Sequence, residues 1–543
     1  MEKQSFAEVV QAGYNFKGAS IYLGGGILNG EVVPQAAVKI PLLTMNRHGL
    51  ITGATGTGKT KTLQAIAESL SEAGVPVLLM DIKGDLSGLA MPGEDHPKIR
   101  ERHEKLGATW EASAFPVELL TLSQEKGARL RATVHEFGPI LFSKILGLND
   151  TQSSLVALVF KFCDDKQLPL VDLKDFKKVL EYITGEAKAN VQAEYGLVST
   201  TSVSLILRKL IELEQQGAEL FFGERSFAVE DLIRNDGGFG VISILRLTDI
   251  QDRPKLFSSF MLQLLGELYA SLPEAGDLDI PKLVLFIDEA HLLFDDAEEA
   301  LLDQIESVVR LIRSKGVGIF FCTQSPKDIP EPVLNQLGLK VQHALRAFTP
   351  NDRKQIKAIA QNYPDSPFYD TEEILTSLGI GEALVTALDE RGSPAPLVAT
   401  LLAAPRSRMS ILTPAEIYSV VARSAIAEKY NERMDRESAY EILGGKIAAS
   451  AKAEPPSQSS PRRTWNPSAP ARKAEPVEQS QPQRAPGLPY PKPESKEVSP
   501  LSKMMTGVGG QVARQVGRTF AATITGAVTR SLLGVMFGGK KRR

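Results

Sequence analysis

The stretch Gly53-Ala54-Thr55-Gly56-Thr57-Gly58-Lys59-Thr60 reads G-x-x-x-x-G-K-T, and it decides the fold of this chain. The apolar run at 48–52 before it predicts a short buried strand, and the spacing at 61–70 predicts a helix. A strand, a glycine loop and a helix in this order are the context that a phosphate-binding loop requires. The stretch therefore predicts a nucleoside triphosphate site, with a simple glycine turn between strand and helix as the alternative.

Each residue type in this loop suits the binding of a polyphosphate. The glycines allow backbone N–H groups to point inward around the phosphates, and the helix N-terminus adds partial positive charge. Lys59 is expected to reach the outer phosphates, and the hydroxyl of Thr60 to hold Mg²⁺. We expect the nucleotide contacts to continue into the first helical turn, through Lys61 and Thr62.

A second apolar strand ends in two adjacent carboxylates, Asp288 and Glu289, after the run at 281–287. In a nucleotide site the aspartate orients Mg²⁺ and its waters, and the glutamate polarises the attacking water. A buried strand with an acidic end also occurs by chance, so the motif gains its weight from the phosphate loop upstream. The segment 81–86 follows another buried strand, and it is either part of the same ligand edge or an ordinary turn.

Further candidates lie near the strand predicted at 317–323. Gln324 ends this strand and suits a sensor of the γ-phosphate, or else it only caps a loop. Arg313 precedes the strand and is our candidate for an arginine finger that reaches a neighbouring subunit, with Arg310 and Arg346 as the other two. His291 follows the acidic pair, but no second histidine lies at metal-ligand spacing, so we expect it in a loop beside the site.

The composition of the chain argues against several classes of protein. The chain has 543 residues, 43% of them hydrophobic, and a formal net charge of −3, which gives no overall argument for a polyanionic partner. Its 2 cysteines, Cys163 and Cys322, are far apart and predict neither a disulfide framework nor a cysteine-ligated metal site. Residues 1–11 carry no secretory signal, and no apolar run reaches about 18 residues. We predict a cytoplasmic protein.

Shifts in composition along the chain indicate its domain organisation. The sequence at 138–222 is charged and has helical spacing, whereas 449–502 is rich in Pro, Ser, Gln, Lys and Glu, which cannot bury enough surface to fold. The predicted segments are a lead-in of strands or loops at 1–47, a core at 48–410 with a helical insertion at 138–222, a helical extension at 411–448, a disordered linker at 449–502 and a tail at 503–543.

The tail repeats every four residues from Val508 onward. As a helix it sets an apolar stripe beside a stripe of small residues, which allow helices to approach closely. The segment ends in four basic residues at 540–543 and has no acid after Glu497. Self-association, attachment at the periphery of an anionic inner membrane and docking on nucleic acid all fit the tail, as does a tail without a specific partner.

Taken in order, these motifs resemble the HerA/FtsK superfamily of P-loop ATPases, in particular its bacterial HerA-like, YjgR-type group. The residues that carry the resemblance span about 20–405, and they are Asn46-Arg47-His48-Gly49, Asp81-Ile82-Lys83-Gly84-Asp85, Phe286-Ile287-Asp288-Glu289-Ala290-His291-Leu292-Leu293, and Arg310-Leu311-Ile312-Arg313-Ser314-Lys315-Gly316-Val317-Gly318 running into Thr323-Gln324. The family also carries an N-terminal β-barrel, for which there is no room before Gly53, and the repetitive tail is not part of its shared core.

The resemblance implies a RecA-like, mainly parallel sheet and a homo-hexameric ring with ATP between subunits. It implies catalytic roles for Lys59, Glu289 and Gln324, Mg²⁺ ligation by Thr60 and Asp288, and a finger role for Arg313. The resulting prediction is an ATP-hydrolysing DNA translocase or helicase-like motor, although no groove-reading helix in the core points to DNA. The alternatives are a membrane-associated transfer ATPase anchored by 503–543 and a nucleotide-gated scaffold with little turnover.

Overall fold

The computed structural model describes residues 2–276, 278–294, 299–432, 434 and 436–445. The predicted linker and tail, at 449–502 and 503–543, lie outside these residues. The predicted helical extension at 411–448 lies within them only in part.

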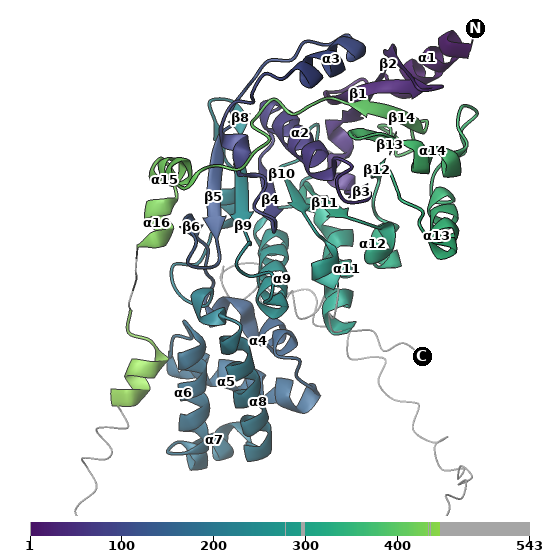
Figure 1. Ribbon diagram of the computed structural model, residues 1–543. Coiled ribbons are helices and arrows are strands. Elements are labelled where there is room, and N and C mark those ends of the chain that lie inside the picture. The colour runs from purple at the N-terminus through teal and green to yellow at the C-terminus, as the bar shows by residue number, and fades with distance from the viewer. Residues whose placement is uncertain (1, 277, 295–298, 433, 435, 446–543) are drawn as a thin grey trace, which may run out of the picture. The chain divides into compact units, whose positions relative to one another are not determined.

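A twelve-stranded sheet runs through the described residues in the order β2-β1-β14-β13-β12-β3-β11-β10-β4-β9-β5-β6 (Figure 1). From β12 to β6 neighbouring strands are parallel, and the remaining pairs are antiparallel. The strands are β1 (Ser20–Leu28), β2 (Glu31–Pro41), β3 (Gly49–Thr52), β4 (Val77–Asp81), β5 (Val117–Thr121), β6 (Ala128–Arg129), β9 (Ile242–Arg246), β10 (Leu283–Ile287), β11 (Val317–Thr323), β12 (Leu339–His343), β13 (Glu382–Thr386) and β14 (Val398–Leu402). The predicted α/β fold with a mainly parallel sheet is confirmed.

The central strands are apolar throughout because helices cover both of their faces. Every residue of β4, β10 and β11 is buried. Alternate side chains such as Leu79 and Phe286 pack with α2 (Lys59–Glu72), whereas Leu285 and Phe321 pack with α9 (Pro254–Ser271) and α11 (Glu299–Ile312). A sheet that buries both faces carries its polar groups at the strand ends, which is where a site can form.

The first 41 residues add two strands and a helix to this sheet. Helix α1 (Glu2–Gly13) packs on β2, and β1 pairs with both β2 and β14. The run Gly24-Gly25-Gly26 lies in β1, where the backbone of β14 approaches closely. A Cβ on Gly24 would lie 2.0 Å from the carbonyl oxygen of Leu401. Glycine is therefore required for this pairing.

Five helices follow β6 and form a separate layer below α9 in Figure 1. They are α4 (Val134–Ile145), α5 (Asp150–Lys166), α6 (Leu173–Thr184), α7 (Lys188–Tyr195) and α8 (Thr200–Gln215). Thr133, Asn149 and Asp172 form capping boxes at three of their starts, which explains why these helices begin where they do. Phe142 and Phe176 meet in their core, with ring centroids 4.9 Å apart.

The chain then returns across the sheet. After β14 a strap of residues 403–412 runs past α2 to α15 (Pro414–Ala422) and α16 (Ala427–Asn431), as the green segment of Figure 1 shows. The remaining helices are α3 (Pro97–Leu106), α10 (His291–Phe294), α12 (Glu331–Leu334), α13 (Pro350–Ala360) and α14 (Thr371–Ser377), and β7 (Asn235–Asp236) pairs with β8 (Phe239–Gly240) in a small hairpin. No helix of the described residues is both long and apolar enough to cross a membrane.

Candidate active site

The glycine loop lies between the carboxyl end of β3 and the start of α2. Gly53, Gly56 and Gly58 all have positive φ angles, which few other residues adopt. Gly53 is also needed for space, because a Cβ there would lie 2.5 Å from the Cβ of His343. The loop is tied to β12 by a hydrogen bond from Ala54 N to the Ala344 carbonyl, 2.9 Å long. The backbone conformation of the loop is therefore fixed both by its neighbours and by its own glycines.

Lys59 points back into this loop, and only 7% of the residue is exposed. Its Nζ donates to the carbonyl oxygens of Gly53, at 2.7 Å, and Ala54, at 3.3 Å. Burial lowers the pKa of Lys59, and the positive charge of Lys83 lowers it further, while Glu289 and Asp288 raise it. These charges act on Lys59 because the ends of β3, β4 and β10 lie along the same edge of the sheet.

Asp288 follows β10 and is 2% exposed. Its Oδ2 atom has no hydrogen-bond partner among the described residues, although buried carboxylate oxygens are normally satisfied. Burial raises the pKa of this carboxyl group to about 6, partly offset by the charge of Lys83. A buried oxygen ligand without a partner suits Mg²⁺, and so does the hydroxyl of Thr60 at the start of α2. The residues present therefore fit this metal.

Glu289 has an unusual backbone conformation. Its φ angle is +47°, in the left-handed region that a glutamate rarely adopts, and such outliers cluster at functional sites. Its carboxylate is almost buried and forms an ion pair with Lys83, and the Nδ1 atom of His291 lies 3.3 Å from Oε2. The structure thus places His291 beside the acidic pair, in contact with Glu289.

Lys83 belongs to the segment 81–86, which the sequence offered as part of the ligand edge, but the sequence did not single it out as a site residue. It lies in a turn after β4, and the Asp81 carboxylate fixes this turn by accepting from the N–H groups of Gly84, Asp85 and Leu86 at 2.7, 3.2 and 3.2 Å. Burial raises the pKa of Asp81 to about 7. The missing signal was strand order: Ile287 pairs with Met80, so that the ends of β10 and β4 are neighbours.

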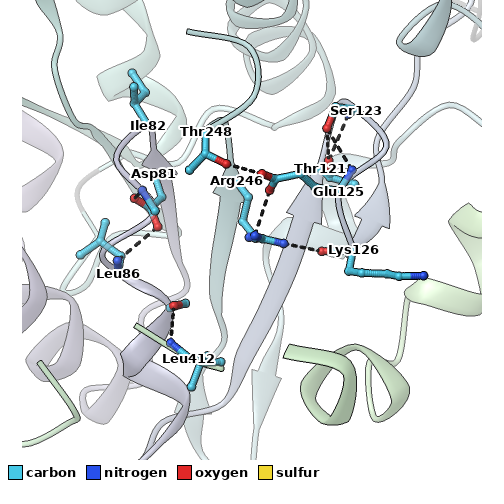
Figure 2. Close-up of polar contacts among 12 residues, drawn as sticks. Asp81, Ile82, Leu86, Thr121, Ser123, Glu125, Lys126, Arg246, Thr248 and Leu412 are labelled. Atoms are coloured by element: carbon cyan, nitrogen blue, oxygen red, sulfur yellow. Dashed lines mark hydrogen bonds and ion pairs between the residues drawn. The ribbon is translucent and has the colours of Figure 1, made fainter. Parts of the chain in front are cut away.

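A polar network continues along this edge to β9 and β5 (Figure 2). Glu125 accepts from Thr248 and pairs with Arg246, whose Nη2 lies 3.1 Å from Oε2. Thr248 also packs on the Asp81 turn, because a Cβ on Gly84 would lie 2.7 Å from its methyl group. The network therefore braces the turn that carries Lys83.

The remaining predicted residues lie at two different ends of the sheet. Gln324 follows β11 and is exposed on the same edge as the glycine loop, and Arg346, beyond β12, is exposed there too. Arg313 instead precedes β11 and is exposed at the opposite, amino edge, where its charge lowers the pKa of the buried His48 beyond the larger effect of burial. Arg310 pairs with Glu306 on α11. Within one chain, Arg313 and the glycine loop are therefore not brought together.

The loop also contacts a second buried histidine that sequence reasoning missed. The Thr62 hydroxyl lies 2.9 Å from Nε2 of His343, the last residue of β12. Burial, together with the charge of Lys59, lowers the pKa of His343 to about 4, so the ring is neutral at pH 7. His343 fixes the position of Thr62. Because the ring is neutral, it adds no positive charge beside that of Lys59.

The comparisons with known proteins agree with this arrangement. The family described as "Helicase HerA-like C-terminal" matches residues 27–542. The chain belongs to this HerA-like family. It is a HerA-like P-loop ATPase, as the motif order predicted. The HerA-like chain is 21% identical over 376 residues to the DNA double-strand break repair helicase HerA of Sulfolobus acidocaldarius, a match covering 68% of both proteins.

Other relatives are similarly distant. The HerA of Saccharolobus solfataricus is 23% identical over 351 residues, a match that covers 64% of this chain and 63% of that protein. Among solved structures, the bacterial conjugative coupling protein TrwB has a TM-score of 0.48 and 14% identity, covering 75% of this chain and 95% of that one. VirB4 of Thermoanaerobacter pseudethanolicus has a TM-score of 0.45 and 16% identity, covering 74% of this chain and 99% of that one.

Proposed function

We propose that this chain hydrolyses ATP with Mg²⁺ and uses the energy to translocate DNA, working as a homo-hexameric ring. The observation that carries the proposal is the group of charged side chains at the carboxyl edge of the sheet. Lys59 begins α2, Asp288 and Glu289 follow β10, and all three are buried. Burying three charges costs stability, and phosphoryl transfer is a reaction that uses all three of them.

Each site residue has a separate role in the in-line displacement of the γ-phosphate by water. Lys59 leaves the carbonyl groups of Gly53 and Ala54 to bind the outer phosphates. Asp288 and Thr60 would hold Mg²⁺, which supplies positive charge to the phosphate oxygens when bound. Glu289 orients and polarises the attacking water, and its contacts with Lys83 and His291 fix its carboxylate. Gln324 lies at the same edge and acts as the sensor of the γ-phosphate.

The finger arginine acts between copies of the chain. Arg313 is exposed at the amino edge of the sheet, away from its own glycine loop. A ring forms when the contact between neighbours is head to tail, so that one face of a copy meets a different face of the next copy. Such a contact can bring the Arg313 edge of one copy to the glycine loop of its neighbour. Arg346 and Arg310 remain the alternative fingers.

DNA is proposed as the polymer because two relatives with matches across 64–68% of this chain are named DNA double-strand break repair helicases. Peripheral membrane attachment or self-association through 503–543 stays a prediction, because that segment lies outside the described residues. A cytoplasmic location stays a prediction too.

The experiment is a measurement of ATP turnover by the purified full-length chain, with and without double-stranded DNA, together with the mass of the assembly. We expect a hexamer whose turnover rises when DNA is added, and no turnover by Lys59→Ala. ATP turnover by a ring without any response to DNA would contradict the DNA assignment. A chain without turnover under any condition would contradict the whole proposal.

A further inference from the structure

A cavity of about 470 Å³ lies beside the first turn of the P-loop helix α2. Gly58, Lys61 and Thr62 form one of its walls, so the cavity begins where the glycine loop ends. Its volume is within the range of sites that enclose small organic ligands. A nucleotide whose phosphates lie on the loop extends its ribose and base past the first turn of this helix. The position of the cavity therefore matches the nucleoside part of a nucleotide.

The other walls of the cavity are held in place by polar contacts. The Arg102 guanidinium donates to the carbonyl groups of Ile380, Gly381 and Leu402, each at 3.0 Å. The strap is fixed to α2, because Lys61 Nζ donates to the Met409 carbonyl at 2.7 Å and Gln64 donates to Ser407 Oγ at 2.7 Å. The cavity is thus part of the folded core.

Trp110 supplies an aromatic ring to this cavity. Its indole is half-buried, and Nε1 donates to the Pro405 carbonyl at 2.9 Å, which fixes the orientation of the ring. Base–aromatic stacking is a common way to bind a nucleobase. Arg408, which also lines the cavity, has a buried Nε that makes no hydrogen bond with the described residues, although its Nη2 pairs with Glu416 at 2.8 Å. A buried donor without a partner is the kind of group that an acceptor on a ligand can satisfy.

A second cavity, of about 360 Å³, lies along the same helix and serves as a comparison. It is lined by Tyr22, Thr109, Glu68 and Glu72, and of the loop region it contains only Thr62. The cavity with Trp110, in contrast, also includes Gly58 and Lys61 of the loop region. The cavity with Trp110 is therefore the better site for the nucleoside.

We propose that the cavity beside α2 binds the nucleoside part of the nucleotide, with the base against the indole of Trp110 and a polar contact from Arg408 Nε. This inference rests on the proposed function, because it assumes that the glycine loop binds the phosphates. It assigns Trp110 and Arg408 as nucleoside-binding residues, and it predicts that binding of the base can be separated from binding of the phosphates.

The test compares ADP with inorganic tripolyphosphate, which has phosphates but no nucleoside. The chain has 2 tryptophans, Trp110 and Trp465, so the full-length Trp465→Phe variant leaves Trp110 as its only tryptophan, which can be excited selectively. We expect its emission to change saturably with ADP and not with tripolyphosphate. Trp110→Ala should raise the Kd for ADP by roughly 5- to 150-fold, the range for loss of one stacked base, and leave the Kd for tripolyphosphate unchanged.

Two further variants keep the result decisive. Trp110→Phe keeps an aromatic ring but loses the Nε1–H donor, so it should bind ADP nearly as well as the wild type does. If Trp110 only held the strap through Pro405, Trp110→Phe would instead weaken ADP binding as much as Trp110→Ala. Thr109→Ala, in the adjacent cavity, is the matched control and should change neither Kd.

A wrong nucleoside assignment and a wrong proposed function would give different binding results. If ADP and tripolyphosphate bind the wild type equally well, and neither changes the Trp110 emission, the nucleoside assignment is wrong while phosphate binding by the loop stands. If the wild type binds neither ligand, the proposed function fails, and the nucleoside assignment fails with it.

Discussion

Two buried aspartates, Asp175 in the predicted helical insertion and Asp288 at the carboxyl edge of the sheet, show how differently these regions use charge. Asp175 accepts hydrogen bonds from the N–H groups of Val171, Asp172 and Tyr440, at 2.9, 3.0 and 2.8 Å, and from Ser438 Oγ. Asp288, in contrast, has an Oδ2 atom without a partner among the described residues. The carboxylate of Asp175 is satisfied by its neighbours, whereas the carboxyl edge of the sheet leaves an oxygen of Asp288 without a partner among the described residues.

The largest effect should come from changing Glu289, the proposed catalytic carboxylate next to Asp288. Glu289→Gln keeps the size of the side chain but cannot polarise water, so ATP turnover should fall by about 10²- to 10⁴-fold while ATP stays bound. Turnover and retained nucleotide would be measured on the same preparation. Glu194→Gln, on α7 of the insertion, is the matched control and should keep full turnover. Turnover by Glu289→Gln within tenfold of the wild type would show that another group activates the water.

A change in the predicted insertion should lower stability and leave ATP turnover intact. Asp175→Asn replaces one acceptor oxygen by an amide donor that faces N–H and O–H groups, so the free energy of unfolding should fall by about 3 kcal/mol. Chemical denaturation measures this change. ATP turnover per folded molecule should be retained, because Asp175 lies in α6 and not at the sheet edge. A stable Asp175→Asn variant that had lost turnover would contradict the division between the two regions.

Asp288→Asn should stabilise the chain when Mg²⁺ is removed. Burial raises the pKa of Asp288 to about 6 from a reference of 3.8, so ionisation of this group opposes folding. The cost is absent below about pH 4, grows as the pH rises to 6 and is constant above it. In EDTA at pH 7.5 the variant should therefore be more stable by about 1–3 kcal/mol. A difference between the two proteins that did not change from pH 4 to pH 7.5 would contradict this origin.

The smallest effect concerns the contact between residues 436–445 and the predicted insertion. Ser438 is buried and donates to Asp175, so Ser438→Ala should lower the free energy of unfolding by about 1 kcal/mol. Because the two residues share one hydrogen bond, Ser438→Ala and Asp175→Asn together should cost less than the sum of the single changes. Additive free energies of unfolding would mean that this hydrogen bond contributes nothing.

The general fold could be predicted from local sequence, and the neighbours within the site could not. Fully apolar runs such as Leu283–Ile287 predicted buried parallel strands, and the glycine loop at 53–60 identified one edge as the ligand edge. The contact between Lys83 and Glu289 depends on β4 lying next to β10, and strand order is set by long-range packing that no motif encodes. Trp110 and Arg408 meet in one cavity for the same reason, since the strap brings them together.

The position of Arg313 relative to the glycine loop could not be predicted from its motif either. Its place before a predicted strand was visible, but only the parallel pairing of β11 with β3 shows that it lies at the edge opposite the glycine loop. The role of Arg313 in a neighbouring copy therefore stays a prediction.

The most direct test of a DNA motor is displacement of a third strand from a DNA triplex by the full-length chain. A motor that moves along the duplex should displace the third strand with ATP and Mg²⁺, and not with a non-hydrolysable analogue or with the Glu289→Gln variant. DNA-stimulated ATP turnover by the wild type without any displacement of the third strand would contradict translocation.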